Sequence, residues 1–576
     1  MPNSIKKYAQ QIDDALADIA VCDPAVGSGA FPVGMMTEIV RARLALTPYF
    51  NDATERTPYH FKRHAIQHCL YGVDIDPGAV EIAKLRLWLS LVVDEEDVEH
   101  INPLPNLDYK IVVGNSLLGF PFKSQRLSDI EKLKQKFFDE TDHAKKAQWK
   151  AQIDQLLAAS FAASKKTLGY EVNFDFQIFF SEVFQRKGGF DVMIANPPYI
   201  DSENMTRDSA QLRQLIQGAY SMTKGNWDIY IAFYERGFQL LNERGILSFI
   251  TPDKWISKSF GNEMRLKTTD KIFSILKAGR SVFETVNVDA IVTVFMQRPQ
   301  PFLRIYDYAG TDIHLKRVIR KDALKSPYSY DWLFSDAIEL LAKIDAHKGH
   351  LSELGVCENA CATSDAYKLQ EFIQEEPKNA TSKEYLRIIN TGTIGKFVSK
   401  WGQREMVYLG SRYVRPVVNK KSFFEAFPNS YGKKAIRRKL IVKGLNLLDA
   451  CLDADGTIIP GKTTLMIASD HLETLKYLLS IVNSSVAFFY LKEKYPASSY
   501  NQGTTFTKEM INDLPIPKIA SNDRSKLVSI TDRIFAAKER NPEADVGLER
   551  EIIDRLVYEL YGLTPEEIDI VEGKSS

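Results

Sequence analysis

"VCDPAVGSGAFPVGMM", residues 21–36, decides the fold, because it joins a short apolar run to a glycine-containing loop and then to a helical pattern. Gly27 and Gly29 let the backbone of this loop approach a ligand closely. A dinucleotide-binding fingerprint would need a third glycine where the chain has Pro32. No "GK[ST]" lysine accompanies the loop either. The stretch therefore predicts a strand–loop–helix unit that binds neither a dinucleotide nor a nucleoside triphosphate.

The same alternation of strand and helix continues through about the first 300 residues. Helical patterns separate most of the apolar runs, most clearly at 77–93. This order predicts an α/β fold with a mostly parallel sheet, and the last two runs suggest an antiparallel finish at its edge. The predicted strands are 19–23, 70–76, 109–116, 190–197, 245–252, 271–279 and 288–297.

Polar residues stand where the first three strands end. Asp74 ends the second strand, where a carboxylate can accept hydrogen bonds from both ribose hydroxyls of a nucleoside. Asn115 ends the third strand, and Asp23 ends the first, where it could receive a cationic amine. Because parallel strands bring their carboxyl ends to one edge, these residues define one crevice. The predicted ligand is a nucleoside without a phosphate chain.

A fourth strand stops abruptly in "FDVMIANPPYI", residues 190–200, because two prolines cannot continue a sheet ladder. Asn196 offers an amide oxygen, and the rigid prolines fix the neighbouring carbonyls. These acceptors can hold an exocyclic amino group while Tyr199 stacks on the flat ring that carries it. A plain strand-ending turn is the alternative, and the neighbouring glycine loop and Asp74 weigh against it.

The motifs "DPAVGSGAF", "GVDIDP", "GNSL" and "NPPY", in this order, resemble the γ class of S-adenosylmethionine-dependent adenine-N6 DNA methyltransferases. With "GILSFITPDKWI" and the tail "DRLVYELYGLTPEEI", nearly the whole chain is similar to the methyltransferase and specificity parts of Type IIG restriction-modification enzymes. The resemblance implies a Rossmann-like methyltransferase sheet, S-adenosyl-L-methionine as cofactor, double-stranded DNA as partner and a target adenine flipped out of the duplex.

The resemblance also implies site residues. Asn196 and the carbonyl of Pro197, with Pro198 beside it, would hold the adenine amino group between Tyr199 and Phe283. Asp23 would face the methionine amine, Asp74 the ribose and Asn115 the cofactor adenine. Many family members carry Asp where this chain has Asn115. The full set of expected cofactor contacts is Asp23, Pro24, Ala25, Gly27, Gly29, Phe31, Asp74, Ile75, Asn115 and Ser116, and no metal is expected.

Four regions are predicted along the chain. Residues 1–310 form the catalytic domain with a charged helical insertion at about 126–170, 311–350 a linker, 351–520 a mixed α+β target-recognition domain, and 521–576 a helical segment. In the last segment a helix precedes Gly562, and a second helix starts at Thr564 with Glu567 as its capping box.

The recognition region contains a basic stretch, residues 396–443, with thirteen Lys/Arg residues against Glu405 and Glu425, and with aromatic residues between them. An excess of positive charge that follows a base-modifying core favours contacts with the phosphates and grooves of DNA. The alternative is a charged surface that is only solvated. The expected DNA-binding residues are Lys396, Arg412, Arg415, Lys433, Lys434, Arg437 and Arg438.

The amino-acid composition excludes few classes of protein. The chain of 576 residues has 74 basic and 74 acidic side chains, and no apolar run approaches the roughly 20 residues that span a bilayer. Five scattered cysteines suggest reduced thiols in a cytoplasmic protein without membrane attachment.

About twenty residues precede the glycine loop. The family's upstream cofactor wall and nuclease domain would then come from another chain, or the chain is a fragment. The leading hypothesis is a site-specific adenine-N6 DNA methyltransferase of a restriction-modification system. The alternatives are the modification and specificity fragment of a fused Type IIG enzyme that needs an N-terminal partner, an RNA or protein-glutamine methyltransferase, and a silent DNA-binding subunit.

Overall fold

The computed structural model divides the chain into two compact units, unit 1 (Met1–Ser329) and unit 2 (Tyr330–Ser576). The described residues are 3–93, 107–120, 132–134, 136–137, 140, 142–161, 170, 172–279, 289–310, 312–321, 330–378, 380–381, 383–428, 430–496, 499–500 and 503–574.

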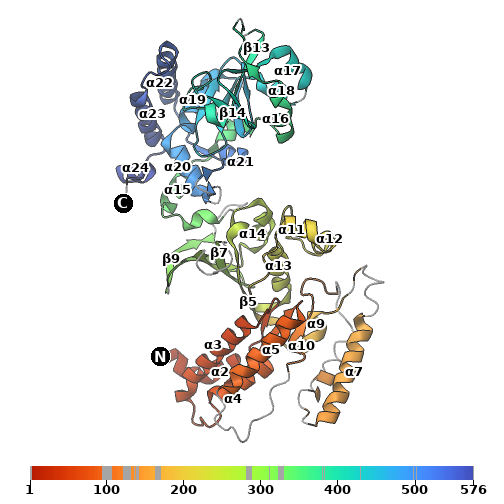
Figure 1. The fold of residues 1–576 in the computed structure, drawn as a ribbon. Coiled ribbons are helices and arrows are strands. Elements are labelled where there is room, and N and C mark those ends of the chain that lie inside the picture. The colour runs from red at the N-terminus through yellow and green to blue at the C-terminus, as the bar shows by residue number, and fades with distance from the viewer. Residues whose placement is uncertain are drawn as a thin grey trace. The chain divides into compact units, whose positions relative to one another are not determined.

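Unit 1 is built on a nine-stranded sheet in the order β3-β2-β1-β4-β5-β7-β6-β8-β9 (Figure 1). The first five strands run parallel, while β7 lies antiparallel between β5 and β6. The strands are β1 (Val21–Asp23), β2 (Leu70–Asp74), β3 (Ile111–Val113), β4 (Phe190–Ala195), β5 (Leu241–Pro252), β6 (Ile272–Gly279), β7 (Ala290–Met296), β8 (Phe302–Ala309) and β9 (Asp312–Arg320).

All seven predicted strands are present, and the predicted α/β class is confirmed. One expectation is wrong: the antiparallel pair does not finish the sheet, because β8 pairs with β6 and β9 pairs with β8 beyond it. Most residues of β9 are exposed or half-exposed. A strand at the edge of a sheet can be polar in this way, which makes it hard to recognise from sequence.

The helices of unit 1 pack on the sheet, and α5, predicted at 77–93, covers the core beside α3 (Figure 1). Asp13 of α2 fixes the N-terminal helix to this layer through ion pairs to Arg43 and Arg56, both at 3.0 Å. The helices are α1 (Asn3–Lys7), α2 (Ala9–Ala17), α3 (Ala30–Leu46), α4 (Pro58–His64), α5 (Pro77–Val92), α7 (His143–Phe161), α9 (Phe176–Phe179), α10 (Ser181–Lys187), α11 (Ser202–Asp208), α12 (Ala210–Ala219), α13 (Tyr230–Leu240) and α14 (Asn262–Thr268).

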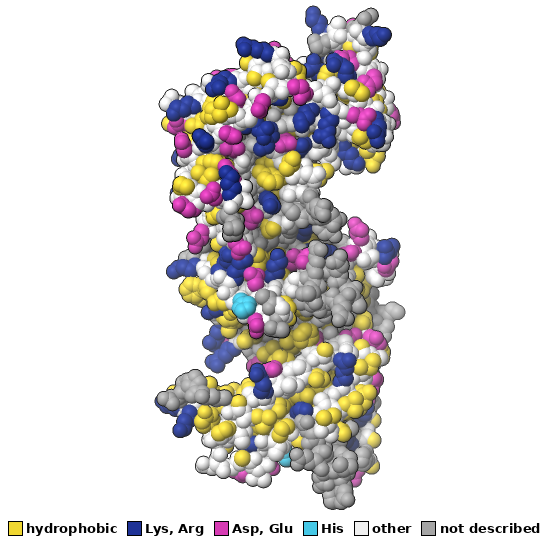
Figure 2. All heavy atoms as spheres, turned by 60° about the vertical axis from the view of Figure 1, so that its left-hand side comes forward, with side chains coloured by type: hydrophobic (Ala, Val, Ile, Leu, Met, Phe, Trp, Pro, Cys, Tyr) yellow, Lys and Arg dark blue, Asp and Glu magenta, His cyan; other side chains and the backbone are white. Residues whose placement is uncertain are grey.

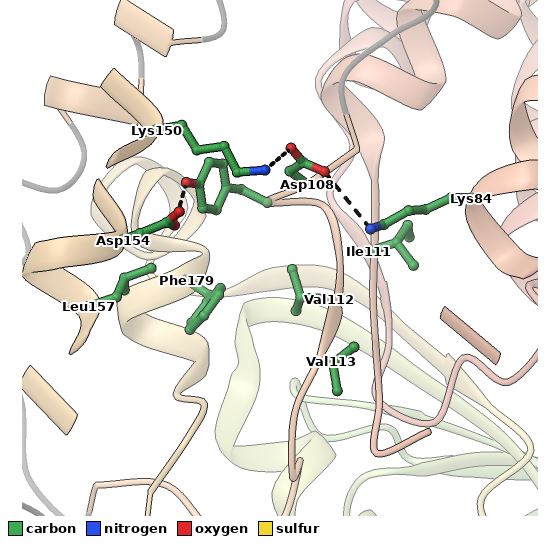
Figure 3. Close-up of a pocket in the computed structure, with 10 residues that line it drawn as sticks. Lys84, Asp108, Ile111, Val112, Val113, Lys150, Asp154, Leu157 and Phe179 are labelled. Carbon is green, nitrogen blue, oxygen red and sulfur yellow. Dashed lines mark hydrogen bonds and ion pairs between the residues drawn. The ribbon is translucent and has the colours of Figure 1, made fainter. Parts of the chain in front are cut away.

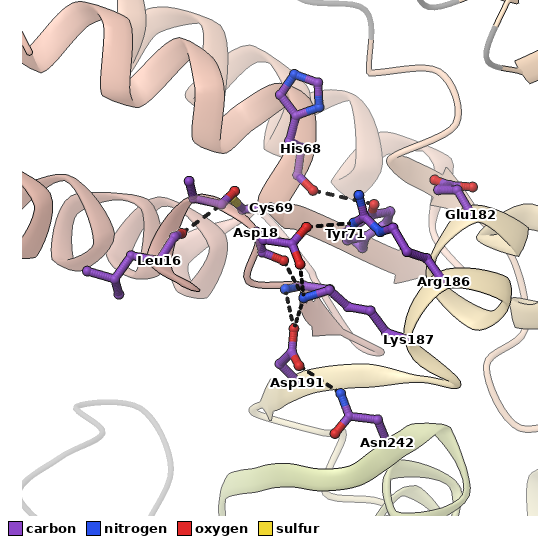
Figure 4. A network of polar contacts seen from close by, with 12 residues as sticks. Leu16, Asp18, His68, Cys69, Tyr71, Glu182, Arg186, Lys187, Asp191 and Asn242 are labelled. Carbon is purple, nitrogen blue, oxygen red and sulfur yellow. Dashed lines mark hydrogen bonds and ion pairs between the residues drawn. The ribbon is translucent and has the colours of Figure 1, made fainter. Parts of the chain in front are cut away.

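A polar clamp holds the amino ends of the central strands, opposite the predicted crevice (Figure 4). Lys187 lies between Asp18 at 2.8 Å and Asp191 at 2.7 Å. Asp191 also accepts hydrogen bonds from the backbone of Ala20 and from Asn242. These contacts join the amino-terminal ends of β1, β4 and β5, so we infer that they stabilise the fold at this edge of the sheet.

The predicted helical insertion is seen in part, as α7 and the short described pieces before it. Phe137, Ile153 and Leu157 of this insertion share an apolar cluster with Tyr109, next to the edge strand β3. Lys134 also forms an ion pair with Glu182 of α10 at 2.7 Å. The insertion is therefore packed onto the sheet.

Unit 2 contains two four-stranded sheets, β11-β20-β17-β18 and β12-β16-β13-β19, which confirms a mixed α and β region. Its strands are β10 (Gly349–His350), β11 (Val356–Asn359), β12 (Gln374–Glu375), β13 (Tyr385–Ile389), β14 (Met406–Tyr408), β15 (Ser411–Tyr413), β16 (Pro416–Asn419), β17 (Lys439–Lys443), β18 (Ala450–Asp453), β19 (Ile458–Pro460), β20 (Thr464–Ala468), β21 (Ser499–Tyr500), β22 (Gly503–Thr504) and β23 (Pro515–Ile516). Its helices are α15 (Ile338–Asp345), α16 (Thr363–Gln370), α17 (Lys420–Ala426), α18 (Ser430–Ala435), α19 (Leu472–Val482), α20 (Ser485–Lys494), α21 (Lys508–Asn512), α22 (Ser521–Arg540), α23 (Gly547–Leu560) and α24 (Pro565–Glu572).

The unit boundaries differ from the predicted ones. Residues 311–350 are not a linker, because β9 belongs to the sheet of unit 1 and α15 belongs to the core of unit 2. Residues 521–576 are not a separate segment, because α22 and α23 share that core with β17 and β20. The capping box of Thr564 and Glu567 is present as predicted.

Within the described ranges, no single helix combines the length and apolarity of a membrane span. Helices α19 and α20 meet that criterion only as a pair, and they bend by 63° where they meet.

Candidate active site

The carboxyl ends of the parallel strands bring the predicted residues to one edge of the sheet. Asp23 is the last residue of β1, Asp74 is the last residue of β2, and Asn196 directly follows β4. Strand order reverses direction at β1, since β2 lies on one side of it and β4 on the other. In open α/β sheets a crevice forms outside the strands at such a point.

Asp74 organises the glycine loop. Its carboxylate accepts hydrogen bonds from the backbone N–H of Gly27 at 2.8 Å and of Asp76 at 3.0 Å. The Val26 N–H adds a bond to the Val73 carbonyl at 2.9 Å. Each carboxylate oxygen keeps a further lone pair, so Asp74 can still accept hydrogen bonds from a ligand.

The two loop glycines differ in what surrounds them, and this gives a stability prediction. Gly29 has φ +83°, and a Cβ there would lie 2.9 Å from the Cα of Ala83 in α5. Gly29→Ala should lower the free energy of unfolding by roughly 2–4 kcal/mol, from left-handed strain plus overpacking. Gly27 has φ +50° with no atom within 4 Å of such a Cβ, so Gly27→Ala should cost only about 1 kcal/mol. Urea unfolding of both variants measures the difference, and equal losses would contradict the close packing on α5.

Asp23 is a buried carboxyl group. Its Oδ1 accepts the N–H of Ala25 at 2.9 Å, and only 2% of the residue is exposed. Burial raises the pKa of Asp23 to about 8; the Ala25 hydrogen bond opposes this rise, and the charge of Asp74 adds to it. The group is therefore mostly protonated at neutral pH until a cation approaches it.

The loop after β3 closes against the glycine loop. The Ser116 hydroxyl donates to the Pro24 carbonyl at 2.6 Å, and the Asn115 side-chain oxygen accepts the N–H groups of Leu117 and Leu118. Both side chains therefore shape the crevice from within the protein, and Asn115 keeps its amide N–H groups as donors. The remaining predicted contacts lie in the same loops: Pro24 is buried, Ala25 and Phe31 are half-buried, and Ile75 is exposed.

The "NPPY" elbow presents Asn196 at the surface. Its side chain is exposed and has no hydrogen-bond partner among the described residues. Pro197 is buried and Pro198 exposed, while the half-buried Tyr199 donates its hydroxyl to the Ile250 carbonyl of β5 at 3.4 Å. Burial raises the pKa of Tyr199 above its usual range, with the neighbouring Tyr234 adding to the rise, so the ring stays neutral. The amide is thus available for a ligand on a rigid support.

One link between the elbow and the cofactor loops was not predicted. The Tyr220 hydroxyl donates to the Leu117 carbonyl at 2.7 Å, and Glu235 of α13 holds the neighbouring N–H groups of Ser221 and Met222. The Ile229 N–H donates to the Ile200 carbonyl at 2.9 Å, just after the elbow. The segment after "NPPY" therefore connects the elbow with the β3 loop. The sequence gives no local signal for this pairing, because its partners are about 100 residues apart.

Phe283, the expected second stacking ring, falls outside the described residues. A cavity of about 250 Å³ lies along the outer side of β3, against α7 (Figure 3). Its polar lining is internally paired, Lys150 with Asp108 at 2.7 Å and Tyr109 with Asp154 at 2.9 Å.

In unit 2 most of the predicted DNA-binding cations already have partners within the protein. Lys396 is half-buried and donates to the Asn483 carbonyl, and Arg438 donates to the Ala454 carbonyl. Lys433 is exposed without an ion pair among the described residues. The ion pairs are Arg412–Glu405 at 3.0 Å, Arg415–Glu376 at 2.6 Å, Lys434–Glu358 at 2.8 Å and Arg437–Asp470 at 3.8 Å.

The surface view agrees with this pairing. Over unit 2, at the top of Figure 2, Lys and Arg side chains are interspersed with Asp and Glu side chains. Among the described residues, five acids from outside residues 396–443 form ion pairs with cations of this stretch, so the local excess of positive charge in the sequence is partly compensated in the fold.

The chain resembles known proteins in sequence. Residues 68–283 match the Eco57I restriction-modification methylase family. The putative type II restriction enzyme and methyltransferase RM.MjaORFECS2P of Methanocaldococcus jannaschii is 23% identical over 96% of this chain and 53% of its own length. The type II restriction enzyme and methyltransferase RM.Eco57I of Escherichia coli is 24% identical over 46% of this chain and 23% of its own length.

A third relative, the adenine-specific methyltransferase PglX of Streptomyces coelicolor, is 23% identical over 43% of this chain and 18% of its own length. The chain spans about half the length, or less, of these curated relatives. Among solved structures, the Type IIL restriction-modification enzyme MmeI in complex with DNA aligns with 99% of this chain and 72% of its own, at a TM-score of 0.53 and 11% identity. That similarity establishes a shared fold.

Proposed function

We propose that this chain transfers a methyl group from S-adenosyl-L-methionine to adenine N6 in duplex DNA, because residues 68–283 match the Eco57I restriction-modification methylase family. The observation that carries the proposal is the exposed Asn196 amide, which has no partner among the described residues and follows β4 at the same sheet edge as Asp23 and Asp74. Unit 2 would recognise the target sequence.

The crevice fits the proposed cofactor in three respects. Gly27 leaves open space beside its backbone, and the Asp74 oxygens beneath it can accept ribose hydroxyls. Ile75 is 68% exposed directly after Asp74, an apolar surface on which an adenine ring can lie. Asp23 is a buried carboxyl that gains from a cationic partner.

One group of residues binds the cofactor, and a second group positions the target base. When bound, S-adenosyl-L-methionine supplies an electrophilic methyl group on its sulfonium. Asn196 Oδ1 and the Pro197 carbonyl accept the two hydrogens of the adenine amino group and so fix the nitrogen that is methylated. Tyr199 stacks on the extrahelical base, as base-modifying enzymes require. Catalysis then comes from orientation and from two fixed acceptors, and the proton that the amino nitrogen loses on methylation passes to solvent.

The raised pKa of Asp23 predicts a proton-linked cofactor affinity. Between pH 6 and 8 the free protein holds a proton on Asp23 that the cationic cofactor displaces, so Kd should rise about tenfold for each pH unit below 8. Calorimetric titration in buffers of different ionisation enthalpy should find about one proton released per cofactor. Asp23→Asn should bind more weakly and release none, whereas a wild-type Kd that is independent of pH would contradict this role.

The same group makes stability depend on pH. The folded-state pKa of about 8 exceeds the usual 3.8, so the stability that Asp23 contributes is complete below pH 3.8 and is lost as pH rises through 8.

Methyl transfer to alternative substrates tests the proposal. The purified chain is incubated with S-adenosylmethionine carrying a tritiated methyl group and with duplex DNA, RNA or a release factor. Label in DNA alone supports the proposal. Label in RNA or in the release factor would replace it with that substrate class, and no cofactor binding at all would leave a silent DNA-binding subunit.

A further inference from the structure

In unit 2 the surroundings of Arg387 differ from those of Arg412 and Arg415. Arg387 lies in β13, next to β16 in the sheet β12-β16-β13-β19, and its side chain is exposed. Among the described residues its guanidinium has no ion pair and no hydrogen bond, whereas Arg412 and Arg415 each have a carboxylate. Arg387 also lies outside residues 396–443, so a count of local charge does not find it.

A fixed aromatic ring supports this guanidinium. The Trp401 indole N–H donates to the Pro416 carbonyl at 2.8 Å, and the ring packs against a cluster that includes Ile389 and Ile458. The Arg387 guanidinium lies 4.7 Å from the ring centroid. Stacking of this kind restricts the side chain at low cost while leaving its N–H groups directed outward.

Arg415 contacts the same ring, but its charge is already paired with a carboxylate. Its guanidinium lies 4.5 Å from the Trp401 centroid and pairs with Glu376 at 2.6 Å. Its backbone N–H donates to Glu375 at 2.9 Å. Arg415 therefore helps to hold the tryptophan in place, and Arg387 is the cation of this group that remains available.

We propose that Arg387 is a specificity-determining residue that reads a guanine of the DNA target through the N7 and O6 acceptors of its major-groove edge. This inference rests on the proposed function. Phosphates can be contacted by any flexible cation, but a planar fork held on a rigid strand matches a pair of acceptors at fixed spacing. Arginine paired with guanine is the commonest specific contact of this kind.

The test compares Arg387→Ala, Arg387→Lys and the control Arg533→Ala on a duplex library with randomised target positions, sequenced for methylated adenines. The wild type should require guanine at one position. Both Arg387 variants should lose that requirement and lower kcat/KM on the preferred site roughly 10- to 100-fold. Lysine keeps the charge but lacks the planar pair of N–H donors, so Arg387→Lys should not restore the requirement for guanine. Arg533 of α22 is exposed and paired with Glu549 at 3.0 Å, so Arg533→Ala should leave the sequence preference unchanged.

Each other outcome contradicts the inference. Equal loss on every sequence, or rescue by lysine, would make Arg387 a phosphate contact. An unchanged preference and rate in both variants, with wild-type thermal midpoints, would remove it from the interface. If the wild-type chain methylates RNA or protein instead of DNA, the proposed function itself fails and the inference fails with it.

Discussion

Asn196→Ala should lower the rate of methyl transfer at least about 100- to 1,000-fold, by analogy with removal of one preorganised polar group from an active site. The side chain is exposed and has no partner among the described residues, so the fold does not depend on it. Its only assigned task is to accept a hydrogen from the target amino group. Cofactor affinity and thermal midpoint should therefore stay near their wild-type values.

Asn204→Ala is a suitable control, because Asn204 lies in α11 shortly after the elbow and its side-chain oxygen accepts a hydrogen bond from Arg207. That variant should keep its rate within a few-fold. Single-turnover transfer and cofactor titration separate the two effects. A wild-type rate in Asn196→Ala would mean that the elbow is only a turn.

Asp74→Ala should raise the cofactor Kd by about a hundredfold or more, because hydrogen bonds to a charged group are each worth roughly 1.5–3 kcal/mol. The carboxylate holds the Gly27 and Asp76 N–H groups and is proposed to accept the ribose hydroxyls. Its removal would loosen the loop and delete the ligand contacts together, so we expect a stability loss of about 1–3 kcal/mol as well.

Asp76→Ala is the matched control for this effect. Asp76 caps α5 through the Gly78 N–H at 2.8 Å and makes no side-chain bond to the glycine loop among the described residues. It should cost about 1 kcal/mol of stability, as caps usually do, and leave cofactor affinity within about threefold. If both variants bound cofactor equally well, the crevice would lie elsewhere.

Much of unit 1 was predictable, because its strands have local patterns. Runs such as 192–195 and 70–73 are continuous and apolar, as buried parallel strands must be, and the residues that follow them stand at one edge for geometric reasons. The position of β7 between β5 and β6 was harder to predict, because the order of strands in a sheet does not depend on the sequence of any single segment. β9 was missed because its residues are mostly exposed and polar.

The charge of unit 2 was the weakest part of the prediction. Arg415 and Lys434 look free in the sequence, but their partners Glu376 and Glu358 lie in segments outside the basic stretch. Lys396 is likewise half-buried, and it donates a hydrogen bond to the carbonyl of Asn483. Such pairings depend on tertiary packing, so the sequence alone predicts the sum of the charges better than the place where positive charge remains available.

Nucleoside analysis of the methylated product tests the central proposal most directly. Duplex DNA containing all bases is incubated with the wild-type chain and S-adenosylmethionine carrying a deuterated methyl group, then hydrolysed and analysed by mass spectrometry. We predict labelled N6-methyladenine as the single labelled nucleoside, and none with Asn196→Ala. Label on cytosine, or DNA that stays unlabelled while the cofactor is bound, would contradict the proposal.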